Sequence, residues 1–269
     1  MNDKDIKAKE ILQNIILLTL CVLMLVLEYS KWDIVADKIQ NIWINRIIQQ
    51  ACGTIAAVIL MNRLKIKLFS KPQHLLYLVP CFLVAIDNFP FYSFFKGNMQ
   101  FVRREVLDVI LFGGYCIAVG LFEECVFRGI LFAVLAGVFS KDKKGFLKTY
   151  FVSSVCFGIA HIFNLFMGAG IGETLLQVGY TILTGGLFGF ALIKTKNLLY
   201  AGIVHAIYNF CGLLLSEQGL GTGIVFDIGT VIIMFLICIM VGGFVLYKVL
   251  TYSEEERIDL YKRLNVKAD

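Results

Sequence analysis

Charged residues are scarce in this chain. They make up 17% of its 269 residues, against about 25% in ordinary soluble domains. By contrast, 58% of the residues are hydrophobic, and the mean hydropathy is +0.78. This balance is typical of a polytopic membrane protein and argues against a water-soluble fold. We find no internal repeat and no segment polar enough to form a separate soluble domain.

Paired cysteine motifs are also missing. The eight cysteines lie within apolar segments, and no two are spaced as Cys-x-x-Cys. This spacing excludes both a disulfide framework and a cysteine-rich zinc site. We therefore expect the cysteines to act as small hydrophobic residues of the core. The first apolar stretch, Ile11 to Tyr29, lacks a small-residue cleavage site. It is therefore interpreted as a retained helix and not as a signal peptide.

Long apolar runs predict the fold. Runs of about 20 residues are long enough to cross a bilayer as helices. Eight such runs lie near 11–29, 44–61, 74–88, 106–139, 147–166, 173–193, 198–215 and 224–247. The sequence thus predicts an all-α membrane bundle of about eight transmembrane helices. The fourth run would extend about 50 Å as one helix. We expect Gly113-Gly114 to break it into a short interfacial helix and the true span.

The distribution of basic residues predicts the orientation. With both termini in the cytoplasm, eighteen of the 25 Lys and Arg residues fall in segments on the inner side, as the positive-inside rule requires. The net charge of +5 then reflects the orientation of the chain in the lipid bilayer. Nucleic acid is not expected as a partner. Ser253 and Glu256 form a capping-box pattern, which predicts a short amphipathic cytoplasmic helix in the tail. The aromatic stretch 89–101 predicts an outer interfacial belt.

Three charged side chains interrupt the apolar segment 121–132. Glu123, Glu124 and Arg128 each cost roughly 2.5–3.5 kcal/mol at the centre of a bilayer, so intramembrane charge indicates a functional site by default. Glu124 and Arg128 are four residues apart and can form an ion pair on one helical face. Glu123 lies about 100° around the helix. It is therefore the better candidate for a general base.

Two of the three histidines also fall within apolar runs. His161 follows Phe157 by four residues, which predicts that the phenyl ring packs against the imidazole. His205 precedes Asn209 by four residues, so these two side chains share one helical face. Either histidine taken alone is compatible with a packing residue that is merely hydrogen-bonded. His74 borders a basic loop and is interpreted as an interfacial residue without a special role. Residues from three separate helices can meet at mid-depth, as a catalytic site requires.

Together these residues resemble the three motifs of a known family. The motifs are Glu123-Glu124-x-x-x-Arg128, Phe157-x-x-x-His161 and His205-x-x-x-Asn209. In this order they resemble the CPBP family of intramembrane proteases, which includes the CAAX prenyl endopeptidases and bacterial bacteriocin-processing and self-immunity proteins. The resemblance covers about residues 105–215, between an N-terminal part (1–104) with three spans and a C-terminal part (216–269) with the last span and the tail.

The resemblance implies hydrolysis of a membrane-anchored, amphipathic or lipidated peptide at the cytoplasmic side. Glu123 and His161 would hold and activate a water molecule. His205 and Asn209 would donate hydrogen bonds to the developing oxyanion, and Arg128 would fix the Glu124 carboxylate. Because many members of this family are bacterial, the resemblance also implies a multi-pass protein of a prokaryotic plasma membrane.

The need for a metal stays open at this point. Glu123, His161 and His205 are the candidate ligands for a possible zinc ion with an open position for water. The His-Glu-x-x-His spacing is absent, however, and the glutamate-histidine mechanism needs no ion, so we favour no metal. Cys125 lies inside the first motif, but a thiol in apolar surroundings is usually inert.

Two other functions compete with proteolysis. A non-proteolytic bacteriocin-immunity or scaffold protein could retain the same fold, although the intact set of motif residues argues against it. A transporter or proton relay could use buried Glu and His, but the chain shows neither an inverted repeat nor paired broken helices.

Overall fold

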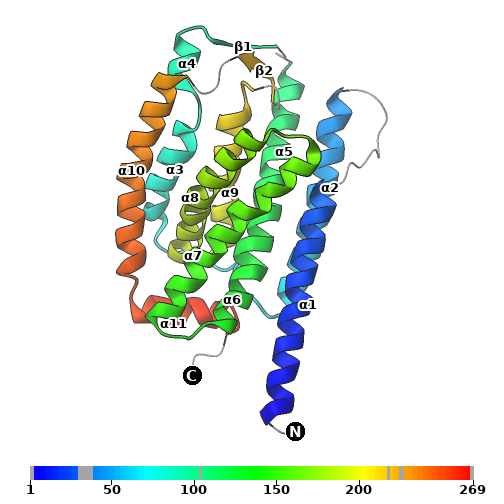
Figure 1. The fold of residues 1–269 in the computed structure, drawn as a ribbon, viewed down its shortest axis with the longest axis vertical. Helices are drawn as coiled ribbons and strands as arrows, with labels where there is room; N and C mark the ends of the chain where they lie inside the picture. Colours follow the sequence, from blue (N-terminus) through cyan, green and yellow to red (C-terminus); the bar gives the residue numbers. More distant parts are fainter. Residues whose placement is uncertain (1–2, 30–38, 103–104, 217–218, 224–226, 267–269) are drawn as a thin grey trace.

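The protein is an all-α helical bundle (Figure 1). The computed structural model describes residues 3–29, 39–102, 105–216, 219–223 and 227–266. The α-helices of this part are α1 (Asp3–Tyr29), α2 (Ile39–Arg63), α3 (Leu78–Asp87), α4 (Phe91–Phe95), α5 (Val106–Glu124), α6 (Phe132–Val138), α7 (Lys143–Ala160), α8 (Ile171–Thr195), α9 (Leu198–Leu213), α10 (Ile228–Leu250) and α11 (Glu254–Arg263). Its 3₁₀ and π segments are η1 (Leu75–Tyr77), η2 (Cys125–Leu131) and η3 (His161–Met167).

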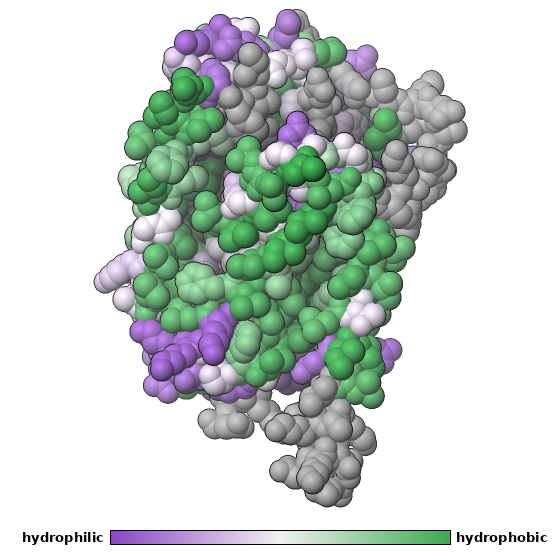
Figure 2. Space-filling view, viewed as in Figure 1, coloured by the Kyte–Doolittle hydropathy of each residue, from purple (hydrophilic) through white to green (hydrophobic). Residues whose placement is uncertain are grey.

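The apolar runs of the sequence form the bundle. In the part of the chain that the structure describes, five helical segments are long and apolar enough to cross a membrane: Ile42–Arg63, Val106–Val138, Lys143–Met167, Ile171–Thr195 and Ile228–Leu250. Three shorter apolar helices are Asn14–Leu27, Leu75–Asp87 and Leu198–Leu213. Hydrophobic side chains cover the middle of the face in Figure 2, and hydrophilic ones gather toward its two ends. A helical membrane bundle is thus confirmed, whereas the count of eight spans stays a prediction.

The two ends of the bundle carry different connections. At the end with α11, the segments expected on the inner side meet: Phe69 forms a β-bridge with Asn197, and Lys67 N–H donates to the Arg263 carbonyl over 2.7 Å. At the opposite end, β1 (Met99–Phe101) pairs antiparallel with β2 (Gly221–Gly223), next to α4 (Figure 1). The assignment of either end to the cytoplasm stays a prediction.

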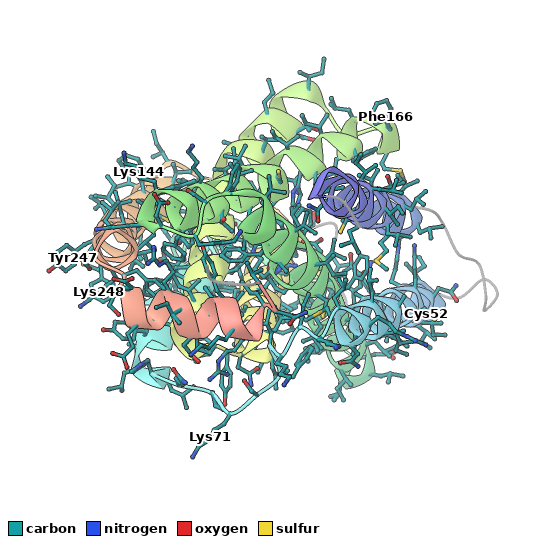
Figure 3. All side chains as sticks on the ribbon, turned by 90° about the horizontal axis from the view of Figure 1, so that it is seen from below. Cys52, Lys71, Lys144, Phe166, Tyr247 and Lys248 are labelled. Carbon is teal, nitrogen blue, oxygen red and sulfur yellow. The ribbon has the colours of Figure 1, made fainter. Side chains whose placement is uncertain are left out.

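The tail forms the predicted capped helix. The Ser253 side chain accepts from Glu256 N–H, and the Glu256 carboxylate accepts from Ser253 N–H. Helix α11 lies across the end of the bundle (Figure 3). Its Glu256 also accepts from Lys194 over 2.8 Å. The capping box predicted from the sequence is therefore confirmed.

The predicted break at Gly113-Gly114 is wrong, because α5 runs through both glycines without interruption. A side chain at Gly113 would meet the Phe210 ring of α9 at 3.7 Å, and one at Gly114 would meet Ile47 of α2 at 3.3 Å. Packing against two neighbouring helices outweighs the cost of about 1 kcal/mol that glycine adds inside a helix. The departure from α geometry comes later, in the π-helical segment η2.

Helices α5 and α9 approach each other closely at Gly120. A Cβ atom there would lie 2.7 Å from the Gly202 carbonyl oxygen and 2.9 Å from the Ala206 nitrogen. No side chain larger than hydrogen fits between these two backbones. The contact sits one turn before Glu123 and beside His205, so it brings the acidic pair of α5 against the histidine of α9.

Candidate active site

The first motif lies at the junction of α5 and η2. Glu123 and Glu124 are the last two residues of α5, and Arg128 lies in η2. Arg128 Nε is 3.3 Å from Glu124 Oε2, and the two side chains are 1% and 0% exposed. The ion pair expected from the i, i+4 spacing therefore exists and is fully buried.

The Arg128 guanidinium reaches beyond this pair to α7 and α8. Its Nη2 donates to the Gly185 carbonyl over 2.7 Å. Its Cζ stands 4.3 Å from the centre of the Phe157 ring, within the range of a cation–π interaction. A side chain at Gly185 would meet both Arg128 Nη2 and Phe157 at 3.0 Å. Arg128 thus joins three helical segments around one charge.

His205 stands between the two glutamates. Its Nδ1 lies 3.1 Å from Glu124 Oε1, and its Nε2 lies 3.6 Å from Glu123 Oε2. The side chain is 4% exposed. Glu124 is paired with Arg128 and is therefore the acceptor in the first contact, so Nδ1 carries a proton. This fixes the orientation of the ring and turns Nε2 toward Glu123.

Two phenylalanines enclose the imidazole. Phe188 of α8 stacks on His205 with centroids 4.4 Å apart and an interplanar angle of 15°. Phe157 meets the same ring edge-on at 5.6 Å. The position of Phe157 is predicted by its spacing from His161, whereas that of Phe188 is not predicted from the sequence. No periodic or spacing signal marks Phe188, because its role depends on how α8 packs against α9.

His161 and Asn209 lie next to this cluster. His161 begins η3, and its Nδ1 is 3.0 Å from the Phe157 carbonyl oxygen. The rings of Phe157 and His161 meet edge-on at 5.2 Å, as the sequence predicts. Both His161 and Asn209 are half-buried, and Asn209 follows His205 by one turn of α9. Phe157 is therefore the common neighbour of both histidines.

The side chains do not form an evident metal site. In the ranges that the structure describes, no group of three His, Cys, Asp or Glu side chains is arranged to hold a metal ion. The Arg128 guanidinium places a fixed positive charge beside Glu124, and one His205 nitrogen is engaged by the same carboxylate. The mechanism proposed for this site uses the side chains alone.

A protein-family model matches part of this chain. Residues 105–211 match the family model described as type II CAAX prenyl endopeptidase Rce1-like. Comparisons with curated proteins and with solved structures each returned no match. The matched segment contains the acidic pair, both intramembrane histidines and Asn209. Through this segment the chain resembles the CPBP/CAAX protease family, and the match confirms the resemblance seen in the sequence.

Proposed function

We propose that the protein is an intramembrane endopeptidase. It hydrolyses a peptide bond of a membrane-associated or lipidated peptide at the cytoplasmic side, in the setting of a prokaryotic plasma membrane. The observation that carries this proposal is the placement of His205 between Glu123 and the buried Glu124–Arg128 pair. The family match alone supports a class of protein, whereas this geometry supports a role for each side chain.

Glu123 acts as the general base. It takes a proton from a water molecule that it holds together with His161, and the resulting hydroxide attacks the scissile carbonyl. Glu123 then delivers the proton to the leaving amine. Glu123 is 9% exposed and His161 is half-buried, so each retains a path to a substrate while little bulk water competes.

His205 and Asn209 stabilise the oxyanion. Because Nδ1 of His205 is engaged by Glu124, the ring donates to the oxyanion from Nε2, so both ring nitrogens carry protons in this step. The Glu124 carboxylate accepts from His205 Nδ1 and keeps the ring in one orientation, while Arg128 pairs with Glu124 and holds it in place. Asn209, one helical turn further, supplies the amide donor. Removing one such donor typically costs about 10²–10³ in rate. Glu124 and Arg128 are therefore positioning residues, and they act through His205.

The test uses the full chain reconstituted in liposomes. The substrates are quenched fluorescent peptides ending in Cys-a-a-X, with and without a prenyl group, and a library of peptides anchored by one apolar helix. Glu123→Gln and His161→Ala should lower cleavage at least about 10³-fold. His74→Asn is the matched control, because His74 lies outside the site and asparagine tolerates its left-handed φ of 45°.

Two outcomes decide the proposal. Equal cleavage by the wild type, Glu123→Gln and His161→Ala would refute it, as would cleavage by none of them on any substrate class. A chelator arm addresses zinc: activity that survives prolonged chelation supports the glutamate-histidine mechanism. Activity that is lost and then restored by added zinc would overturn the metal-free part while leaving the protease intact.

A further inference from the structure

Asp87 is a buried carboxylate at the end of an apolar helix, and no motif uses it. It is the last residue of α3 and ends the apolar helix Leu75–Asp87. Its side chain is 8% exposed. Burying a carboxylate without a partner costs free energy, so a residue of this kind indicates a functional site.

Within the described residues Asp87 makes no hydrogen bond or ion pair. The nearby Asp227 carboxylate, by contrast, accepts several hydrogen bonds. Asp227, which caps α10, accepts from Thr230 N–H over 2.8 Å and from Ser93 Oγ over 3.0 Å. The local donors are thus committed to Asp227. Asp87 is left with acceptor capacity that no donor among the described residues fills.

Asp87 lines a small cavity between α3, α4 and α10. The other lining residues are Phe89, Phe91, Tyr92, Thr230, Ile233 and Met234. The space open to a water-sized sphere is about 10 Å³, which is close to the minimum for one such particle. The cavity therefore admits a single compact group next to the carboxylate.

The walls favour a positive charge. Asp87 supplies the anion, the last turn of α3 adds the negative end of its helix dipole, and aromatic rings attract cations. Lys96 Nζ already stands 4.5 Å from the centre of the Tyr92 ring, so an ammonium is compatible with this ring system. Thr230 Oγ1 is occupied by Ser93 N–H. Few oxygens remain, and a metal ion would need more of them.

We propose that this cavity binds a primary ammonium group. The source is an amine small enough to place its –NH₃⁺ against Asp87, either the headgroup of an aminophospholipid or a free amine. Helix α4 lies at the end of the bundle opposite α11 (Figure 1), where the hydrophobic face gives way to hydrophilic residues (Figure 2). We expect lipid headgroups at this level, because amphipathic aromatic residues gather at membrane interfaces.

The test compares lipids that differ in the amine alone. The full chain is placed in nanodiscs of phosphatidylethanolamine with phosphatidylglycerol, or of phosphatidylcholine with phosphatidylglycerol. Lipids retained on the protein are counted by native mass spectrometry. We expect the wild type to retain phosphatidylethanolamine about tenfold over phosphatidylcholine, as one charge-assisted hydrogen bond allows. Asp87→Asn should abolish this preference. Asp108→Asn, which changes another buried aspartate, should keep it.

A titration of the wild type alone keeps the proposal testable if Asp87→Asn does not fold. In detergent without lipid, ethanolamine should raise the thermal unfolding temperature, whereas choline, whose trimethylated head exceeds the cavity, should not. Stabilisation by ethanolamine together with the lipid preference identifies the ammonium group as the ligand. Stabilisation without the preference identifies a free amine as the source. Equal retention of both lipids and no effect of ethanolamine would overturn the proposal, as would a preference that persists in Asp87→Asn.

Discussion

Replacing Arg128 with methionine should destabilise the fold strongly. Arg128 is 1% exposed, donates to the Gly185 carbonyl over 2.7 Å and pairs with Glu124 at 3.3 Å. Methionine keeps much of the packing volume but leaves Glu124, which is 0% exposed, with His205 as its remaining partner. Removing one member of a buried ion pair typically costs about 3–5 kcal/mol. We expect a loss of this size in the free energy of unfolding.

A double-mutant cycle separates the charge effect from packing. In Glu124→Gln/Arg128→Met both charges are gone, so no uncompensated carboxylate stays buried. We therefore expect the double variant to be about 1–3 kcal/mol more stable than Arg128→Met alone. If the variant effects simply added, the double variant would instead be the least stable of the three.

Equilibrium unfolding in detergent micelles measures these differences. Arg257→Met is the control, because its ion-pair partner Glu254 is 78% exposed, and such pairs contribute at most about 1 kcal/mol. A loss below about 1 kcal/mol for Arg128→Met would refute the reasoning. It would mean that Glu124 takes up a proton or rearranges without cost when Arg128 is removed.

Three further predictions concern packing, pH and the tail. Gly185→Ala should lower the unfolding temperature and the peptidase activity, because its Cβ would press on Arg128 at 3.0 Å, whereas Gly242→Ala, with nothing within 4 Å, should change neither. Burial lowers the pKa of Lys196, in the loop after α8, to about 7. Between about pH 7 and the ordinary lysine pKa of 10.5, Lys196 is protonated in the unfolded chain but not in the folded one. The free energy of unfolding should therefore rise with pH over this range in the wild type, but not in Lys196→Met. Ser253→Ala removes the side-chain cap of α11. It should lower the free energy of local opening of this helix, measured by hydrogen exchange, by about 1 kcal/mol.

The sequence was sufficient for features set by local patterns. Apolar runs located the helices because length and hydropathy decide which segments can span a bilayer. The i, i+4 spacing of Glu124 and Arg128 placed their ion pair, and the Ser253–Glu256 pattern placed the capping box. Each of these depends on residues close in the chain, so helical geometry alone specifies the contact.

Features that depend on neighbouring helices were not predictable in this way. Gly113 and Gly114 favour a break by propensity, yet contacts with α9 and α2 keep α5 continuous. The stacking of Phe188 on His205 joins α8 to α9, and nothing in the local sequence distinguishes Phe188 from the other phenylalanines of the bundle. The same holds for the pairing of β1 with β2, which lie more than a hundred residues apart.

The π-helical segment η2 explains how a spanning helix accommodates the acidic pair. It begins directly after Glu124, and Phe132 N–H donates to the Phe127 carbonyl five residues earlier. The Phe127 carbonyl also accepts from Ser153 Oγ of α7 over 3.3 Å. A wider turn leaves carbonyls less tightly committed to the helix, and such turns occur often at functional sites. Arg128 lies within this turn and reaches Gly185 of α8 while it still pairs with Glu124. The departure from α geometry therefore falls in the segment where one arginine both orders the carboxylate that holds His205 and binds α8.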